Sequence, residues 1–173
     1  ERVFIVDGNS VLYRSYYALP GLTTSRGFPT NAIYGFHNIL RKLIKEEKPR
    51  YLAVAFDVKG PTVRHKKYEA YKAQRKPMPN DLAVQIPKVK QLLEAMNIPY
   101  FEMVEYEADD VMATIAEKLR EQGYEPVIVS GDKDLLQVLK PGILIFHPGK
   151  EIYIDHESCE EYFGVKPEQV PHV

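Results

Sequence analysis

Short apolar runs alternate along this chain with longer segments of helical periodicity. Nearly continuous β-branched and aromatic runs predict buried parallel strands at residues 2–6, 51–56 and 125–130. Apolar positions three and four residues apart predict helices over about 10–19, 31–48, 82–97 and 108–122. Because the strands alternate with helices, we expect an α/β fold with a mainly parallel central sheet flanked by helices.

Shorter patterns predict the remaining elements. Residues 98–103 form a strand candidate that contains Pro99, so we expect it near an edge of the sheet. Asn31 is expected to cap the helix that follows it. Residues 143–146 and 152–154 flank Pro148-Gly149 and predict a hairpin. Short helices are expected over 135–139 and 155–163, and the last residues, 167–173, are expected to begin a connection.

Aspartates follow three of the predicted strands. Asp7 ends the first, Asp57 ends the second, and Asp132 and Asp134 follow the third. In parallel α/β sheets, ligands bind at the carboxyl ends of the strands. We therefore expect these side chains to lie together at that edge of the sheet. A second acidic group can face the same edge from the start of a predicted helix: Glu107, Asp109 and Asp110.

Seven carboxylates in one place need a stronger partner than a helix N-terminus, which offers only about 0.3–1 kcal/mol per charge. Oxygen ligands of this kind suit Mg²⁺ or Mn²⁺. Two such ions about 3.5–4 Å apart can activate a water molecule and stabilise the leaving oxygen in phosphodiester hydrolysis. For the acidic group at the helix start alone, a turn that merely caps the helix is the alternative.

Positive charge is concentrated between residues 59 and 76, where seven Lys or Arg residues face one acid, Glu69, although the net charge of the chain is −1. A helix there would present a stripe of Arg64, Lys67, Tyr71 and Arg75. Cations interleaved with tyrosines suit the phosphates and unstacked bases of nucleic acids. A solvated surface helix is the alternative.

Several other classes of protein are disfavoured by the sequence. No apolar run is long enough to span a bilayer, and we expect no signal peptide. Cys159 is the only cysteine, which excludes an internal disulfide and fits a reducing compartment. Zinc-binding Cys/His sets, a P-loop and Gly-x-Ser-x-Gly are absent. A phosphoaspartate at Asp7 is possible but disfavoured, because Asn9 stands where an acid/base would be useful.

Six motifs, in order, match one known family: Phe4–Gly8, Leu22–Gly27, Phe56-Asp57, Arg64-His65 with 71–75, Tyr106–Asp110, and Gly131–Leu135. On these residues the sequence resembles the N-terminal 5′ nuclease domain of bacterial DNA polymerase I, within the flap endonuclease (PIN-like) superfamily. The resemblance covers essentially all of residues 1–173, and it implies a PIN-like 5′ nuclease fold with a basic helical arch, or clamp, over residues 60–81.

The resemblance also implies a function. Such domains are divalent-metal-dependent 5′→3′ exonucleases and structure-specific 5′-flap endonucleases, which act on DNA with flaps, nicks or RNA primers in replication and repair. The implied cofactors are two Mg²⁺ ions, for which Mn²⁺ can substitute. We accordingly expect a monomeric, cytoplasmic, nucleoid-associated protein that is covalently followed by a polymerase domain. A PIN-type ribonuclease and a catalytically impaired nucleic-acid-binding fragment are the alternatives.

Roles for individual residues follow from the motif matches. The first metal ion would be surrounded by Asp7, Asp57, Glu107, Asp109 and Asp110, and Asp132 and Asp134 would lie between it and the second. Phosphates would be held by Arg14, Lys72 and Arg75, with Lys72 also counted as catalytic, and the arch would contribute Arg64, Lys67 and Tyr71. In the family, two further metal ligands and a helix-hairpin-helix element follow the equivalent of residues 165–173, so we expect this chain to lack them.

Overall fold

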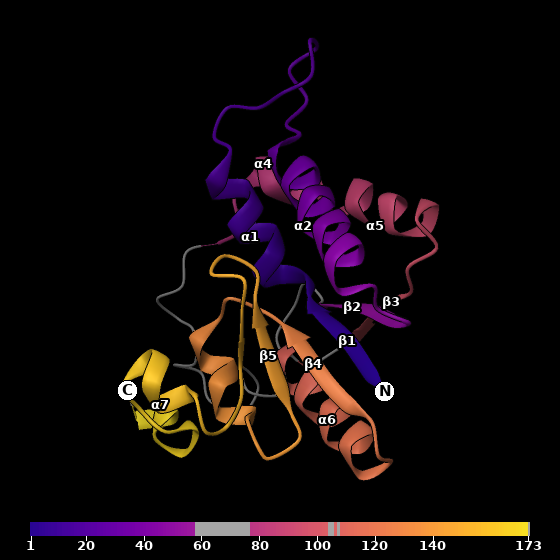
Figure 1. Ribbon diagram of the computed structural model, residues 1–173. Coiled ribbons are helices and arrows are strands. Elements are labelled where there is room, and N and C mark those ends of the chain that lie inside the picture. Colours follow the sequence, from indigo (N-terminus) through magenta and orange to yellow (C-terminus); the bar gives the residue numbers. More distant parts are fainter. Residues whose placement is uncertain (58–76, 104–105, 107, 173) are drawn as a thin grey trace.

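The computed structural model describes residues 1–57, 77–103, 106 and 108–172 (Figure 1). Its centre is a six-stranded sheet with the strand order β3-β2-β1-β4-β5-β6. The strands are β1 (Arg2–Asp7), β2 (Tyr51–Asp57), β3 (Tyr100–Met103), β4 (Glu125–Val129), β5 (Leu144–His147) and β6 (Ile152–Ile154). All neighbouring pairs are parallel except β5 and β6, which form an antiparallel hairpin. The predicted mainly parallel α/β fold is therefore confirmed, and β3 lies at an edge as expected.

Helices cover both faces of this sheet. The α-helices are α1 (Gly8–Ala18), α2 (Asn31–Glu47), α4 (Asn80–Ala83), α5 (Ile86–Ala95), α6 (Ala108–Glu121) and α7 (Cys159–Phe163). Two 3₁₀ helices, η1 (Lys133–Val138) and η2 (Pro167–His172), complete the described elements. In Figure 1, α1, α2 and α5 lie on one side of the sheet and α6 on the other.

Alternation along the strands produces two separate cores. In β1, Phe4 and Val6 point into a core shared with α1, α2 and α5, whereas Ile5 points into a core shared with α6 and η1. β4 divides in the same way, because successive side chains of a strand face opposite sides of the sheet. A strand that is buried on both faces must be apolar throughout, which explains the continuous runs seen in the sequence.

Three predicted helices have different limits in the structure. Residues 82–97 form two helices, α4 and α5, because Pro87 has no N–H to donate to the preceding turn and instead lies in the first turn of α5. The segment after Asp132 is a 3₁₀ helix, and α7 begins at Cys159 rather than at residue 155. Residues 167–172, expected to begin a connection, form η2.

The expected cap of α2 is wrong. Asn31 is the first residue of the helix, and the residue before it, Thr30, makes no capping hydrogen bond with its side chain. The acceptor is the Oε1 atom of Gln85, which takes hydrogen bonds from the N–H groups of Ala32 (2.9 Å) and Ile33 (3.1 Å). Gln85 is fully buried. This helix is therefore capped by a buried side chain that lies 53 positions after Ala32 in the sequence.

Two predictions about composition have a structural counterpart. Cys159 is completely buried and serves as a packing residue in the core beside α6. No helix among the described residues is long and apolar enough to cross a membrane.

The predicted arch spans residues 60–81. Its residues 60–76 lie outside the described part of the chain, and residues 77–81 lie within it.

Candidate active site

The carboxyl ends of three adjacent strands bring together the strand-end aspartates. Asp7 is the last residue of β1, Asp57 is the last residue of the neighbouring β2, and Asp132 follows β4 on the other side of β1. Burial is the main cause of the raised pKa of Asp7, and the negative charges of Asp132 and Asp57 raise it further. Three acids that are far apart in the sequence therefore lie at a single edge of the sheet.

Asp7 is the most constrained of these carboxylates. Only 6% of the residue is exposed. Its Oδ1 atom caps α1 by accepting the N–H of Ser10 (3.2 Å), and its Oδ2 atom accepts the hydroxyl of Ser130 (2.8 Å). Burial raises the pKa of Asp7 to about 7, against the lowering effect of the two hydrogen bonds. The group is thus held in a fixed orientation in a place where a bare negative charge is unfavourable.

Ser130 connects Asp7 to the next acidic residue, and sequence analysis missed it. Its hydroxyl donates to Asp7 and accepts the backbone N–H of Asp132 (3.1 Å), and the residue is buried. Asp132 in turn begins η1, where its Oδ1 atom accepts the N–H of Asp134 (2.9 Å). Only its position directly after a strand and before an acidic motif could have indicated this role.

The motif Asp7-Gly8-Asn9-Ser10 is explained by contacts with the neighbouring strands. A Cβ atom on Gly8 would lie 2.6 Å from the Phe56 ring, so β2 can approach only a glycine there. Asn9 holds Asp57 from two sides: its Nδ2 donates to Oδ2 of Asp57 (3.2 Å), and its Oδ1 accepts the N–H of Asp57 (3.2 Å). Asn9 thus positions an acid.

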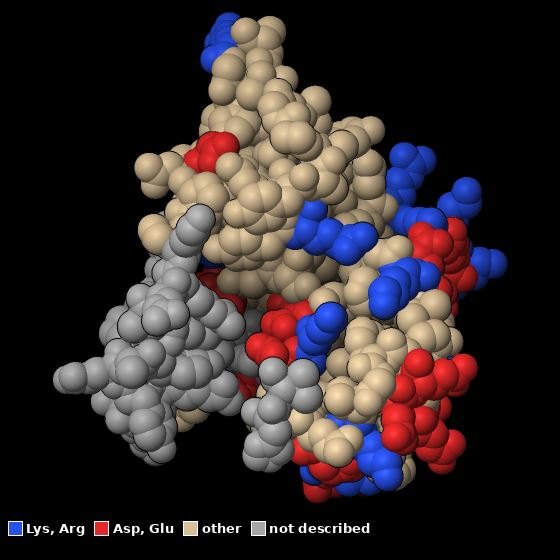
Figure 2. All heavy atoms as spheres, turned by 90° about the vertical axis from the view of Figure 1, so that its left-hand side faces the viewer, with Lys and Arg blue, Asp and Glu red and all other residues tan. Residues whose placement is uncertain are grey.

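The acidic group at the start of α6 is described only in part. Asp110 lies in the first turn of α6, whereas Glu107 and the side chain of Asp109 lie outside the described residues. Among the side chains that are described, no group of three or more His, Cys, Asp or Glu residues has an arrangement that could hold a metal ion. Acidic side chains nevertheless gather in a hollow near the middle of the face seen in Figure 2, close to Lys or Arg side chains.

Arg14 is the one predicted phosphate-binding residue that lies in the described part of the chain. It is exposed on α1, one turn after Ser10, and its guanidinium packs against Gly149 in the loop between β5 and β6. Beside it lies His147, the last residue of β5, which sequence analysis did not select. The other predicted contacts lie outside the described residues: Arg64, Lys67, Tyr71, Lys72 and Arg75.

The fold of this chain has a counterpart among solved structures. The bacteriophage T5 flap endonuclease, in a complex with DNA and metal ions, superposes with a TM-score of 0.68 at 22% identity. The superposition covers 98% of this chain and 64% of that one. At this level of identity the likeness establishes a shared fold.

Sequence comparison defines the family. Residues 2–164 match the model of the 5′-3′ exonuclease N-terminal resolvase-like domain, and the chain therefore belongs to that family. It is 47% identical over 171 residues to a 5′-3′ exonuclease of Aquifex aeolicus. This match covers 99% of this chain and 59% of that protein. It is also 47% identical over 176 residues to DNA polymerase I of Caldicellulosiruptor bescii, where the match covers 98% of this chain but 21% of the polymerase.

Proposed function

We propose that this chain is the catalytic domain of a metal-dependent 5′ nuclease that hydrolyses phosphodiester bonds in DNA. The observation that carries the proposal is the meeting of Asp7, Asp57 and Asp132 at the ends of β1, β2 and β4. Burying a carboxylate beside two others costs free energy, and a bound cation would offset that cost directly. A cation-binding enzyme needs such a cluster.

Carboxylate oxygens are hard ligands, so the donor set fits Mg²⁺ or Mn²⁺. The residues that would hold two ions are the seven strand-end and helix-start acids: Asp7, Asp57, Glu107, Asp109, Asp110, Asp132 and Asp134. Bound there, divalent ions supply an activated water molecule and stabilise the leaving oxygen. Ser10 and Ser130 fix the two oxygens of Asp7, and Asn9 fixes Asp57, so the protein orients its ligands in advance.

The proposed substrate is DNA with a 5′ flap, a nick or an RNA primer. The segment 60–81 would close over the 5′ strand as a basic arch, in which Arg64, Lys67, Tyr71, Lys72 and Arg75 contact phosphates and bases. Arg14 would hold a phosphate near the strand ends. The names of the relatives and the T5 complex with DNA support this assignment, and the small share of the polymerase covered suggests that a polymerase domain follows.

The decisive experiment measures cleavage of an end-labelled 5′-flap duplex by the natural full-length protein, with Mg²⁺ or with EDTA. We expect cleavage near the flap junction only with the metal, and little cleavage of a single-stranded RNA control. Asp132→Asn should reduce the rate by at least about a hundredfold without unfolding the protein, since it weakens ligation of both ions. Asp155→Asn changes an exposed carboxylate on another surface and should cut normally. Metal-independent cleavage, or full activity of Asp132→Asn, would overturn the proposal.

A further inference from the structure

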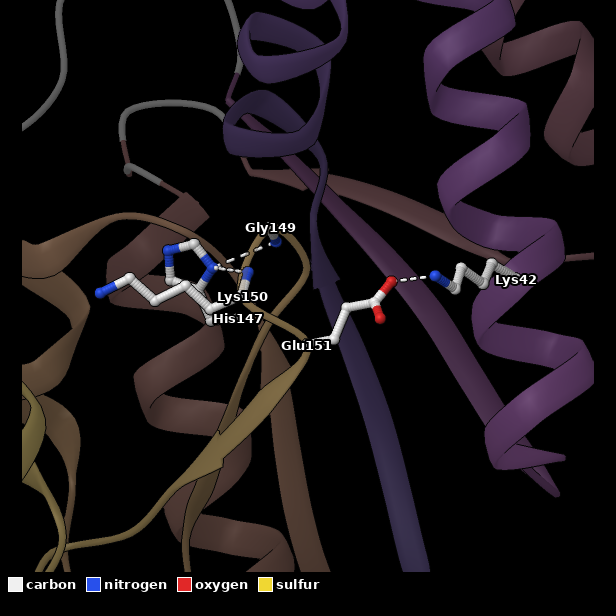
Figure 3. Close-up of polar contacts among 5 residues, drawn as sticks. All are labelled: Lys42, His147, Gly149, Lys150 and Glu151. Carbon is white, nitrogen blue, oxygen red and sulfur yellow. Dashed lines mark hydrogen bonds and ion pairs between the residues drawn. The ribbon is translucent and has the colours of Figure 1, made fainter.

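His147 is fixed in one protonation form by the loop that follows it. Its Nδ1 atom accepts the backbone N–H groups of Gly149 (3.1 Å) and Lys150 (3.0 Å), as Figure 3 shows. A ring nitrogen that accepts two hydrogen bonds carries no proton, so the neutral imidazole has its proton on Nε2. Burial lowers the pKa of His147, as do Arg14 and Lys150, which keeps the ring neutral at physiological pH.

The remaining nitrogen, Nε2, points to the edge where the strands end. It lies 3.5 Å from the position of a Cβ atom built on Gly131, and the hydroxyl of Ser10 lies 3.9 Å from the same position. Gly131 directly precedes Asp132, and its N–H donates to the Ser10 hydroxyl (3.2 Å). No described residue accepts a hydrogen bond from Nε2. The donor therefore faces the proposed active site from the side of β5.

Positive charge surrounds this donor. The guanidinium of Arg14 packs on Gly149, two residues beyond His147, and occupies the space that a side chain at that position would fill. The ammonium group of Lys150 lies over the Phe163 ring, 4.9 Å from its centroid. Lys150 therefore adds positive electrostatic potential near the strand ends without contacting a ligand there. A neutral N–H donor beside a guanidinium forms a site for an anion, and phosphate is the anion of the proposed substrate.

The loop is also held from the side of α2. Glu151 forms an ion pair with Lys42, as Figure 3 shows, and the hydroxyl of Tyr153 donates to Glu47. The N–H of Glu151 closes the loop on the carbonyl of His147 (2.8 Å). His147 is thus positioned before any ligand binds, which reduces the entropy lost when it makes a hydrogen bond to one.

We propose that the Nε2–H of His147 donates a hydrogen bond to a phosphate oxygen of the bound DNA strand, next to the phosphate contact of Arg14. His147 is then a substrate-binding residue that helps to place the strand against the metal site. The inference rests on the proposed function, and it adds a ligand contact from β5 to a site otherwise built from β1, β2, β4 and α6.

The variant His147→Asn separates this role from the structural one. The Oδ1 atom of asparagine can take the place of Nδ1 and accept the two loop N–H groups, but nothing replaces Nε2–H. In the natural full-length protein we expect kcat/KM on a 5′-flap substrate to fall about tenfold, as for loss of a hydrogen bond to a charged group. The melting temperature should not change. His156→Gln, a histidine substitution near α7, is the matched control and should leave both values unchanged.

The salt dependence of DNA binding tests the proposed contact separately from any structural role of His147. Measured in EDTA, binding of the flap duplex by His147→Asn should weaken while its slope against log salt stays that of the wild type, because a neutral donor displaces no counterion. Arg14→Gln should reduce the slope by about 0.9. Wild-type binding and cleavage by His147→Asn would overturn the inference, as would a loss accompanied by a lower melting temperature. If the wild type binds but fails to cut flaps, the proposed function fails while the binding comparison still tests His147.

Discussion

Asp7 has two roles that make opposite demands on its charge. As the cap of α1, it accepts the N–H of Ser10, and a helix N-terminus favours a negative group. As a buried neighbour of Asp57 and Asp132, it is disfavoured as an anion. The balance raises its pKa to about 7, so a divalent cation is what would make ionisation favourable at neutral pH.

This balance predicts a pH effect on stability. Between the ordinary pKa of 3.8 and the folded value of about 7, the native state holds a proton that the unfolded state has lost. The free energy of unfolding of the metal-free protein should therefore fall as the pH rises through this range, by on the order of 4 kcal/mol from Asp7. Urea unfolding in EDTA from pH 4 to pH 8 measures it, and Asp7→Asn should lack this part of the decline.

Asp155→Asn is the control for that experiment. Hydrogen bonds from Ser158 lower the pKa of Asp155, so this group is ionised in both states above pH 5 and its removal leaves the slope from pH 5 to pH 8 unchanged. Asp7→Asn with the full wild-type decline would mean that another group causes it.

A second prediction at the residue scale concerns Gly149. A Cβ atom there would overlap the guanidinium of Arg14, so Gly149→Ala should displace Arg14 without changing any charge. We expect flap cleavage to slow by about tenfold, because a small displacement of a positioning group is costly. In an Arg14→Gln background the same substitution should have no further effect. Additive losses in this double-mutant cycle would contradict the contact.

At the scale of elements, Gln85 joins three helices. Besides capping α2, its Nε2 atom donates to the Oδ1 of Asn31 (2.8 Å) and to the carbonyl of Asp81 in α4 (2.8 Å). Asn31 then donates to the carbonyl of Tyr16 in α1 (2.9 Å), and the hydroxyl of Tyr16 donates to the Asp81 carboxylate (2.7 Å). The chain that follows the predicted arch is thereby tied to α1, which carries Arg14.

Removing this junction should destabilise the fold. Gln85→Ala leaves the N–H of Ile33 without its acceptor and the N–H of Ala32 with only the Oδ1 atom of Asn31. It also opens a cavity, and we expect a cost of about 2–4 kcal/mol in the free energy of unfolding. Denaturant unfolding measures the change. Gln91→Ala, an exposed glutamine on α5, should shift it by less than about 0.5 kcal/mol. Equal effects of the two substitutions would show that the buried network contributes little.

At the scale of the whole molecule, the sheet separates two cores and leaves its carboxyl edge as the place where polar groups meet. Helices α1 and α6 lie on opposite faces, so they approach that edge from two sides. Strands β2, β1 and β4 supply one acid each. Because these strands are held by both cores, the acids are positioned without any metal, and the repulsion among them is offset by packing elsewhere.

Metal binding should therefore be visible as a gain in stability. A ligand that binds only the native state raises the free energy of unfolding by about 2.7 kcal/mol at a hundred times its dissociation constant. We expect saturating Mg²⁺ to raise the melting temperature by several degrees at pH 8, and by less at pH 5.5, where protons compete for Asp7. Asp132→Asn should reduce the gain at pH 8. An absence of any Mg²⁺-dependent shift in the wild type would argue against an ion at this edge.

The sequence by itself determined the elements and the edge at which the acids meet. Continuous apolar runs and helical apolar periodicity are local properties, and parallel strands place their carboxyl ends at one edge of the sheet, so Asp7, Asp57 and Asp132 could be predicted to lie at the same edge. The split at Pro87 was also available from local chemistry, because proline cannot donate the hydrogen bond of a helix interior.

Only the tertiary structure decided which distant side chains complete these local features. Gln85 caps α2 from 53 residues away, Ser130 holds Asp7 from 123 residues away, and His147 reaches the site because β5 pairs with β4. Polar residues of these types occur throughout the chain, and no periodicity distinguishes the ones that find a partner. Their roles depend on strand order and helix packing, which are set by the sum of many long-range contacts rather than by any one segment.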